Sequence, residues 1–335
     1  MLGILVLWLI TRGQDLEMIG RELKQANYWW ILLVMVISLL SHVVRATRWN
    51  ILIASMGFAT NTRQTFLAVM TGYLSNLALP RMGEITKCAV LSKTATVPFN
   101  ALIGTVVSER VVDFFSLVVI ALLTLALQFH FISGFLNEFF FAPALALGSG
   151  NIRLFAIVAV VLIIMTAYMI IFLHRKFKKA ATDSFYYKLR RQWIGFGHGV
   201  RTLWRMERKG AFLFQTLLIW GMYFLTVYLC FFAIGATSHL SPLAGLTLLA
   251  VGSLGILAPV PGGIGTYHFI TIITLSELYG IITEQATSYA YIAHAAQMLI
   301  VILAGGAAWL VLSLKKNKPR PTGAKSPETQ PGLVK

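Results

Sequence analysis

Two short polar runs interrupt sequence that is otherwise strongly apolar, NLALPRMGE at 76–84 and SERVVD at 108–113. Each run combines an arginine with carboxylates. An arginine guanidinium is a permanently charged, fork-shaped donor that suits phosphate oxygens. The carboxylates can hold the arginines while no ligand is bound, or exchange protons. We predict that the two runs form one anion site, and its residues are Asn76, Arg81, Glu84, Glu109, Arg110 and Asp113.

The same residues also have a purely structural interpretation. On a helix, Glu109 lies four residues before Asp113 and Arg110 lies three before it, so the three occupy neighbouring faces. Buried ions must be paired, and a self-neutralising network would fix the fold without binding a ligand. Asn76 and Gln297 can likewise serve as hydrogen-bond partners between helices. Both interpretations remain open at the level of sequence.

The environment of these charges is hydrocarbon. The chain has 335 residues, of which 57% are hydrophobic and only 12% are charged, against about 25% charged in an average soluble domain. Apolar runs of about 18 to 25 residues recur along it, which is the length that crosses a bilayer core. A charge inside such a run is costly and therefore calls for a role. We predict an all-α polytopic membrane protein.

Most of the formal net charge of +16 lies in two segments. Segment 174–209 has 11 Lys/Arg and 2 Asp/Glu, and segment 314–335 has 6 Lys/Arg and 1 Glu, so together they carry +14. Both flank apolar spans, and the positive-inside rule places them in the cytoplasm. No nucleic-acid recognition fold accompanies the charge, so membrane lipids and not nucleic acids are the expected partners. The two cysteines, Cys88 and Cys230, have neither disulfide nor metal spacing, and no metal or cofactor is expected.

Apolar segments bounded by aromatic or charged residues predict about six transmembrane helices. Residues 2–10 form about 14 Å of helix, too little to span, and are expected to be a truncated first helix or part of one. Aromatic residues open the span 28–44, and Arg45 and Arg48 close it on the cytoplasmic side. The remaining spans are 99–129, 152–173, 211–234 and 286–314.

Two further segments, 64–93 and 243–282, are predicted to be re-entrant helical hairpins. Each is apolar but is broken near its middle by residues that end a helix. Non-helical backbone at membrane depth must be buried in protein or line a water-filled cavity. The charge pattern orients the first hairpin from the cytoplasm and the second from the other side, which is typical of a transporter site near the midplane. Exposed amides at the second break could also bind an anion. The break residues are Pro80 and Gly83 in the first hairpin, and Pro259, Pro261, Gly262, Gly263 and Gly265 in the second.

The whole of 1–314 reads as a single integral membrane domain, since no linker-like change in composition divides it. The tail 315–335 is basic and rich in proline, so it is predicted to be disordered. We expect the N-terminus, the loop 174–209 and the tail to lie in the cytoplasm, and the protein to lie in the inner (plasma) membrane.

Four motifs in this order, Arg48-Trp49, NLALPRMGE, SERVVD and PVPGGIG, resemble the transmembrane region of the lysylphosphatidylglycerol synthases. The resemblance covers roughly 28–314. It implies a flippase-like membrane protein that moves or binds a phospholipid or a polyprenyl-linked lipid. The full synthases also carry a soluble aminoacyl-transferase domain, which this sequence does not contain, so the resemblance argues against lysyl transfer here.

The sequence departs from the family pattern in its second half. Many relatives place a glutamate three residues after PGGIG, where this chain has His268, and an arginine near the region of His294 and Gln297. With Arg48, these residues form a secondary polar group. Each histidine is interpreted as a hydrogen-bonded interior side chain, with a proton relay as the alternative.

The leading hypothesis is therefore a lipid translocase that binds an anionic phospholipid or polyprenyl-phosphate-linked lipid. One alternative is an intramembrane enzyme that acts on a lipid phosphate or a glycosyl lipid, with Glu109, Asp113 and His268 as acid and base. The sequence has no H-E-x-x-H pair, nucleophile elbow or P-loop, so no catalytic residue is assigned. Another alternative is a scaffold for a lipid-modifying enzyme, and a homo-oligomer is also compatible with the sequence.

Overall fold

The computed structural model describes residues 2–95, 97–129, 206–257 and 260–316, and every regular element in these ranges is a helix. Four of the helices are long and apolar enough to cross a membrane. The prediction of an all-α polytopic membrane protein is thus confirmed. The four helices are α3 (Tyr28–Ala54), α6 (Phe99–Leu127), α11 (Lys209–Cys230) and α14 (Thr283–Lys316).

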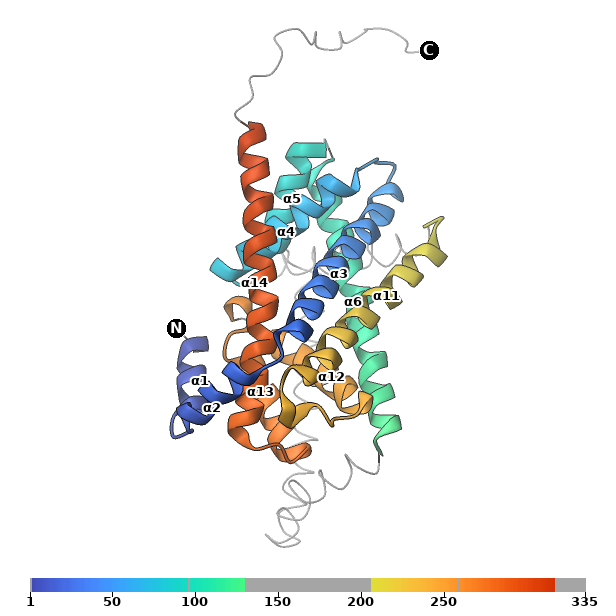
Figure 1. Ribbon diagram of the computed structural model, residues 1–335. Helices are drawn as coiled ribbons and strands as arrows, with labels where there is room; N and C mark the ends of the chain where they lie inside the picture. The colour runs from blue at the N-terminus through green and yellow to red at the C-terminus, as the bar shows by residue number, and fades with distance from the viewer. Residues whose placement is uncertain (1, 96, 130–205, 258–259, 317–335) are drawn as a thin grey trace, which may run out of the picture.

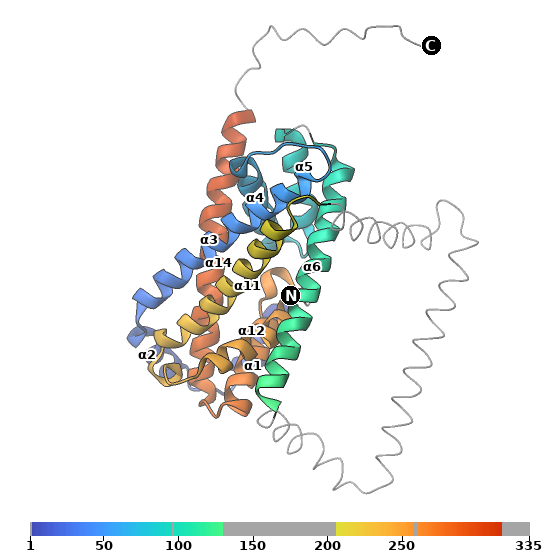
Figure 2. The ribbon, with the colours of Figure 1, turned by 90° about the vertical axis from the view of Figure 1, so that its right-hand side faces the viewer.

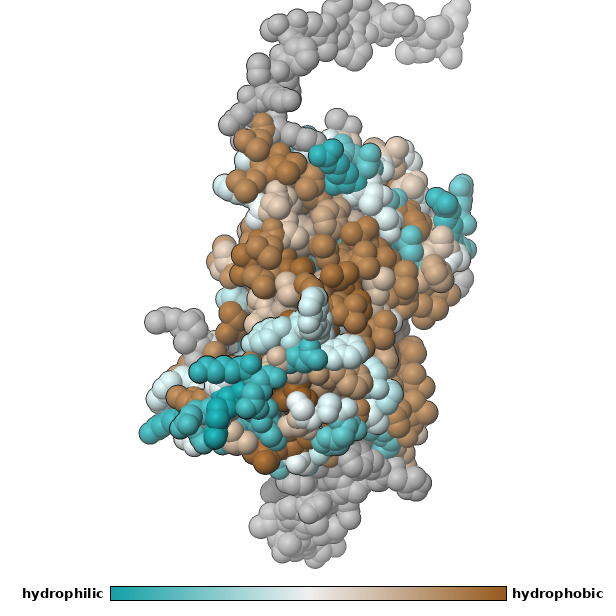
Figure 3. Space-filling view, viewed as in Figure 1, coloured by the Kyte–Doolittle hydropathy of each residue, from teal (hydrophilic) through white to brown (hydrophobic). Residues whose placement is uncertain are grey.

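The long helices are arranged side by side, and α3 packs against α6, α11 and α14 (Figures 1 and 2). At most 33% of the most apolar window of each helix is buried, and each helix has exposed leucines, such as Leu32, Leu122, Leu217 and Leu303. Brown, hydrophobic surface covers the middle of the molecule in Figure 3. Such a band would be unstable in water and fits the hydrocarbon core of a bilayer.

Helix α3 is longer than the sequence suggested. It continues past residue 44 to Ala54, and Arg45 and Arg48 lie inside it with only 6% and 0% of their surface exposed. The prediction that these arginines close the span after residue 44 was wrong. The helix can continue because carboxylates from a neighbouring helix neutralise both side chains within the protein.

The first predicted hairpin consists of α4 (Thr62–Ala78) and α5 (Met82–Ala95), which pack against each other. A capping box formed by Asn61 and Gln64 fixes the start of α4, satisfying backbone N–H groups that a helix start leaves unpaired. The break is limited to 79–81, because α5 resumes at Met82. Gly83 therefore lies in the first turn of α5 and not in the break where the sequence placed it.

The second predicted hairpin consists of α12 (Pro242–Leu257) and α13 (Thr266–Ile273), joined through the short 3-10 turn η4 (Pro261–Gly263). A π-helical turn, η5 (Thr274–Leu278), and a short loop connect it to α14.

The two hairpins start from opposite ends of the molecule. The first follows the end of α3 and leads into the start of α6, whereas the second follows the end of α11 and leads into the start of α14 (Figure 1). Their tips meet, since α4 contacts η4.

Two short N-terminal helices complete the described part. Helix α1 (Leu2–Thr11) packs against α13, and α2 (Leu16–Gln25) packs against α14. Asp15 caps α2 by accepting from two backbone N–H groups. The predicted span 152–173, the loop 174–209 up to residue 205 and the tail from 317 lie outside the described residues.

Candidate functional site

Five charged side chains from three helices form an ion network in the interior, here called the buried network. Arg45 and Arg48 come from α3, Lys87 from α5, and Glu109 and Asp113 from α6. Asp113 binds both arginines, with its Oδ1 2.8 Å from Nη2 of Arg48 and its Oδ2 3.1 Å from Nη2 of Arg45. Glu109 pairs with Lys87, and its Oε1 lies 3.6 Å from Nη2 of Arg48.

Helix periodicity explains why these residues meet. The two arginines of α3 are three residues apart and the two carboxylates of α6 are four apart, so each pair lies on one face of its helix. Since α3 packs on α6, the two faces can neutralise each other.

Aromatic and hydroxyl side chains hold the network in place. Trp49 donates from Nε1 to the Thr105 hydroxyl at 2.8 Å, and its ring lies 4.4 Å from Nζ of Lys87. Nη1 of Arg48 donates to the Thr216 hydroxyl at 3.2 Å. An aromatic face beside a desolvated cation is stabilising, so these contacts lower the cost of burying the charges.

The buried network holds more positive than negative charge. Its three cations and two carboxylates sum to +1 if all are ionised. Nε of Arg45, Nε of Arg48 and Oε1 of Glu109 are buried without a hydrogen-bond partner among the described residues. Unpaired buried polar atoms are rare and call for an explanation. Because its net charge is positive, the buried network can accept an additional anion more easily than an additional cation.

An outer ion pair lies beside the buried network. Nε of Arg110 is 2.8 Å from Oε1 of Glu84, and Nη1 of Arg110 is 3.8 Å from Oδ2 of Asp113. The Arg110 and Glu84 side chains are 47% and 40% exposed, so solvent screens their attraction and the pair contributes little stability. Arg110 thus links the interior carboxylate Asp113 to the surface.

The predicted anion site is brought together in part. Glu84, Glu109, Arg110 and Asp113 lie in or beside the buried network, as described above. Arg81 lies at the exposed tip of the first hairpin and has a positive φ of 64°, a conformation that costs about 1–2 kcal/mol for a residue with a side chain. Strain of this kind occurs often at binding sites.

Asn76 supports the backbone of the first hairpin. Its Oδ1 accepts the N–H of Gly83 at 2.6 Å, which ties α4 to the first turn of α5. This contact matches the interpretation of Asn76 as a hydrogen-bond partner between helices.

Sequence reasoning missed Arg45 and Lys87 as members of the network and placed Arg48 only in the secondary polar group. One signal could have found the arginines, namely a pair of basic residues three apart in one helix and a pair of acids four apart in another. Lys87 has no comparable signal, because its partner Glu109 is 22 residues away.

The two histidines of the second half lie together at the second hairpin. The rings of His268 and His294 are 4.6 Å apart. His294 Nε2 is 2.9 Å from the carbonyl oxygen of Gly262, and Nδ1 of His268 accepts the N–H of Gly265 at 3.4 Å. Both residues are buried, as expected for hydrogen-bonded interior side chains. Gln297 lies three residues after His294 on α14 and is half-buried.

The glycines of the second break meet a backbone requirement. Gly262, Gly263 and Gly265 have φ values of 60°, 74° and 86°, which favour glycine over any residue with a side chain. A Cβ on Gly265 would also collide with the carbonyl oxygen of Gly3 in α1. Pro261 begins η4, and Pro259 lies outside the described residues.

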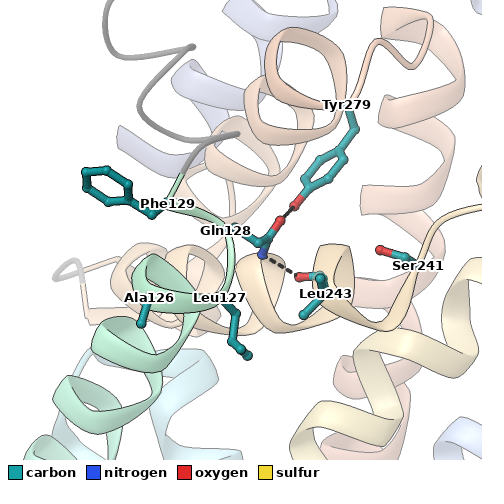
Figure 4. A pocket seen from close by; sticks show the side chains of 7 residues that line it. All are labelled: Ala126, Leu127, Gln128, Phe129, Ser241, Leu243 and Tyr279. Atoms are coloured by element: carbon teal, nitrogen blue, oxygen red, sulfur yellow. Dashed lines mark hydrogen bonds between the residues drawn. The ribbon is translucent and has the colours of Figure 1, made fainter.

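A hollow of about 430 Å³ lies at the far end of α6 (Figure 4). Tyr279 donates its hydroxyl to Oε1 of Gln128 at 3.1 Å, and Nε2 of Gln128 donates to the Leu243 carbonyl at 3.0 Å. Burial raises the pKa of Tyr279, so its hydroxyl keeps the proton that it donates. Gln128 is about 22 Å along the helix from Asp113. We interpret these bonds as a clamp between α6 and the second hairpin. The lining residues are Ala126, Leu127, Gln128, Phe129, Ser241, Leu243 and Tyr279.

Long apolar helices around a buried ion network define the class of an all-α polytopic membrane protein. The family model described as the lysylphosphatidylglycerol synthase TM region matches residues 1–305, and the chain belongs to this family. A UPF0104 membrane protein of Methanocaldococcus jannaschii is 33% identical to it over 113 residues. That match covers 31% of this chain and 34% of the relative, so the chain spans about a third of the relative's length. No solved structure matches the chain.

The family is related to membrane lipids, and the resemblance to it that the sequence indicated is confirmed. Among the residues described by the structure, no group of three or more His, Cys, Asp or Glu is placed to hold a metal ion.

Proposed function

We propose that this protein is a lipid translocase of the inner membrane, which binds the headgroup of an anionic phospholipid or polyprenyl-phosphate-linked lipid near the middle of the bilayer. The observation that carries the proposal is the position of the buried network. It includes Lys87 of the first hairpin, whose tip meets the second hairpin coming from the opposite end.

The hairpin arrangement supports transport. Helical hairpins that enter from opposite sides are typical of transporters with a site at the midplane. Backbone breaks at that depth are tolerated where protein or a water-filled cavity satisfies them. Here His294 bonds to the backbone of the second break, and Asn76 bonds to the first turn of α5, directly after the first break. Both tips are therefore stabilised inside the protein.

The charges support an anionic ligand. The buried network has a surplus of one positive charge, and Arg110 reaches from Asp113 to the surface. A phosphate group can replace Glu84 as the partner of Arg110, since both are anionic acceptors for a guanidinium. Arg81, at the tip of the same hairpin, supplies a second guanidinium.

The distribution of basic residues supports one orientation. Arg63 lies in the first turn of α4 and Lys93 in the last turn of α5, at the same end of the molecule as the start of α11 at Lys209 (Figure 1). By the positive-inside rule this end lies in the cytoplasm, which also places the loop before α11 and the tail there.

The ion pairing of the two interior carboxylates favours a transporter over an enzyme. Glu109 and Asp113 are both held in ion pairs with lysine or arginine, whereas a general acid or base needs a proton to exchange near neutral pH. His268 bonds to the backbone of its own hairpin. We therefore propose no catalytic residue and no cofactor, with membrane lipids as the partners.

Removing the guanidinium of Arg110 or of Arg81 is expected to slow translocation at least about tenfold. A hydrogen bond to a charged group contributes about 1.5–3 kcal/mol, and 1.4 kcal/mol corresponds to a factor of ten. The measurement is the rate at which labelled phospholipid headgroups become accessible on the opposite leaflet of proteoliposomes that contain Arg110→Ala or Arg81→Ala.

Arg63→Ala is the matched control, because Arg63 is an exposed arginine at the other end of α4. It should retain the wild-type rate. Wild-type translocation by both Arg110→Ala and Arg81→Ala, at normal protein levels, would show that these arginines do not bind the headgroup.

A further inference from the structure

Two buried histidines at the second hairpin are not used by the proposed phosphate site. The ring of His268 on α13 and the ring of His294 on α14 have centroids 4.6 Å apart. Only 4% of His268 and 6% of His294 is exposed. Histidine is the side chain that ordinarily gains or loses a proton near neutral pH. Two of them in contact inside the protein therefore form a candidate site for a proton.

The hydrogen bonds of the two rings assign their protons in the neutral state. His294 Nε2 lies 2.9 Å from the carbonyl oxygen of Gly262, and because a carbonyl only accepts, this nitrogen donates. Nδ1 of His268 accepts the N–H of Gly265, so the proton of this ring is on Nε2. One further proton can therefore bind at Nδ1 of either ring.

Of the two Nδ1 atoms, that of His294 is the better place for the further proton. Protonation there keeps the bond to Gly262 and makes it charge-assisted, and such bonds are about twice as strong as neutral ones. Protonation of His268 would remove the acceptor of the Gly265 N–H and would place positive charge in the first turn of α13, where the helix dipole disfavours it. Two charged rings this close would repel each other strongly, so the pair takes up a single proton.

Uncharged side chains surround the two histidines. The Tyr267 ring lies 5.4 Å from the His294 ring, and the Tyr291 ring lies 5.3 Å from the His268 ring. Helices α1 and α12 pack against α13, and neither contains a charged residue, a histidine, a cysteine or a tyrosine. The environment therefore supplies no charge from these two helices.

The other elements that pack against α13 or α14 do carry charged residues, but none of these pairs with a histidine. Their basic residues include Arg45 and Arg48, which belong to the buried network. No ion pair among the described residues includes either histidine. A proton on the pair would thus be a positive charge without a carboxylate beside it in the described part of the chain. The acids on these elements are Glu17 and Glu22 on α2, Glu277 on η5 and Glu284 on α14.

The histidine pair and the phosphate site lie at a similar depth. Helices α6 and α14 start at opposite ends of the molecule (Figure 1). Arg110 is 11 residues after the start of α6, and His294 is 11 residues after the start of α14. Each is therefore about 16 Å along its helix, close to half of a hydrocarbon core about 30 Å thick.

The second break connects the histidines to the first hairpin. Gly262, whose carbonyl bonds to His294, lies so close to α4 that an added Cβ would be 3.2 Å from Cδ2 of Leu77. Leu77 is in the last turn of α4, four residues before Arg81 at the strained tip. One backbone turn thus joins the histidine pair to the segment that carries a candidate phosphate ligand.

We infer that His268 and His294 form a proton-binding site, and that the protein moves one proton together with each anionic headgroup. The inference rests on the proposed function and names the ion that accompanies the lipid. The proton comes from water, forms an N–H bond at Nδ1 of His294 and returns to water on the other side, where that bond breaks. A positive charge on the pair favours a phosphate nearby, and by linkage a bound phosphate favours the proton equally. A singly charged phosphodiester and one proton then cross the hydrocarbon without net charge, which avoids a large cost.

A pH difference across proteoliposomes tests the inference. Labelled phosphatidylglycerol, a singly charged phosphodiester, is added to the outer leaflet of vesicles that contain the full-length protein and are one pH unit more acidic outside. One proton per lipid should concentrate the label about tenfold in the inner leaflet at equilibrium, because one pH unit corresponds to about 1.4 kcal/mol. Reversing the pH difference should reverse the ratio, and vesicles without protein give the background.

His294→Gln is expected to abolish the tenfold accumulation. Glutamine can still donate to the Gly262 carbonyl but does not bind a proton near neutral pH, so the label should become equal in the two leaflets. His239→Gln is the matched control, because His239 is an exposed histidine before α12, and it should keep the tenfold ratio. Accumulation that persists in His294→Gln and is lost in His268→Gln/His294→Gln would overturn the assignment of the proton to His294.

The final distribution of the label separates the inference from the proposed function. Label that stays in the outer leaflet of wild-type vesicles would overturn both. Equal label in the two leaflets of wild-type vesicles, under either pH difference, would overturn the proton site and leave the translocase supported. The wild-type ratio decides the coupling by itself, so the result stands even where a variant is inactive and leaves its label outside.

Discussion

Replacing Glu109 by glutamine is expected to destabilise the protein by about 3–5 kcal/mol, the cost of leaving a buried charge without its partner. Glu109 is 0% exposed and pairs with Lys87, which is itself only 5% exposed. Without the carboxylate, the buried network would hold Arg45, Arg48 and Lys87 against Asp113 alone. The surplus of positive charge would rise from +1 to +2 in a site that water cannot screen.

The same charge count predicts a milder effect for Lys87→Met. That change removes a cation and brings the buried network to neutrality, while Glu109 keeps Arg48 at 3.6 Å. We expect a loss of about 1 kcal/mol, within the usual range for single substitutions. In the double variant Glu109→Gln/Lys87→Met both partners are gone, so the loss should be well below the sum of the two single losses, by up to about 3 kcal/mol.

Unfolding of the four proteins in detergent, followed by heat and by denaturant, measures these differences. Glu277→Gln is the matched control, because Glu277 is an exposed glutamate on η5, and it should shift the free energy of unfolding by less than about 0.5 kcal/mol. Equal stability of Glu109→Gln and Glu277→Gln would mean that the network does not carry buried charge as described.

Replacing Gly83 by alanine is expected to destabilise the protein, with an effect second only to that of Glu109→Gln. A Cβ there would overlap the carbonyl oxygen of Gly72 and the side-chain amide of Asn76. Backbone oxygen cannot turn away, so α4 and α5 would have to separate. Overpacking of this kind costs about 1–3 kcal/mol, and here it would also break the bond between Asn76 and the Gly83 N–H.

Gly104→Ala is the control, and it is expected to raise stability where Gly83→Ala lowers it. Gly104 lies in α6, and no atom outside its own helical surroundings lies within 4 Å of a Cβ at that position. Alanine should therefore stabilise this helix by up to about 1 kcal/mol. The two variants are compared by their unfolding midpoints and by the protease sensitivity of the segment 76–84. A gain of stability in Gly83→Ala would contradict the close approach of α4 and α5.

Much of the fold could be predicted from the sequence because apolar runs and helix breakers act locally. The breaks at Pro80 and in PVPGGIG follow from residues that cannot continue a helix, and the structure places both between two helices. The end of α3 could not be predicted in this way. Two arginines after an apolar span usually mark the membrane–water interface. Here Asp113 of α6 neutralises them, and that compensation depends on contacts between residues more than 60 positions apart in the sequence.

The candidate site was predicted only in outline. The run SERVVD contains both interior carboxylates, and intramembrane charge was a sound reason to select it. Its partners were assigned to Arg81 and Arg110, whereas the interior partners are Arg45, Arg48 and Lys87. Charge identifies which residues need a partner, but only helix packing determines which opposite charge lies within about 4 Å.

The sequence by itself determined that this is an all-α membrane protein, that two polar runs interrupt its apolar segments, and that the helices break at Pro80 and in PVPGGIG. Those properties follow from hydrophobicity, helix propensity and charge, which each residue carries with it. The tertiary structure alone decided which charges meet, with Arg45, Arg48 and Lys87 against Glu109 and Asp113. Their net charge is a sum over side chains from separate helices, and it is fixed only when α3, α5 and α6 pack together.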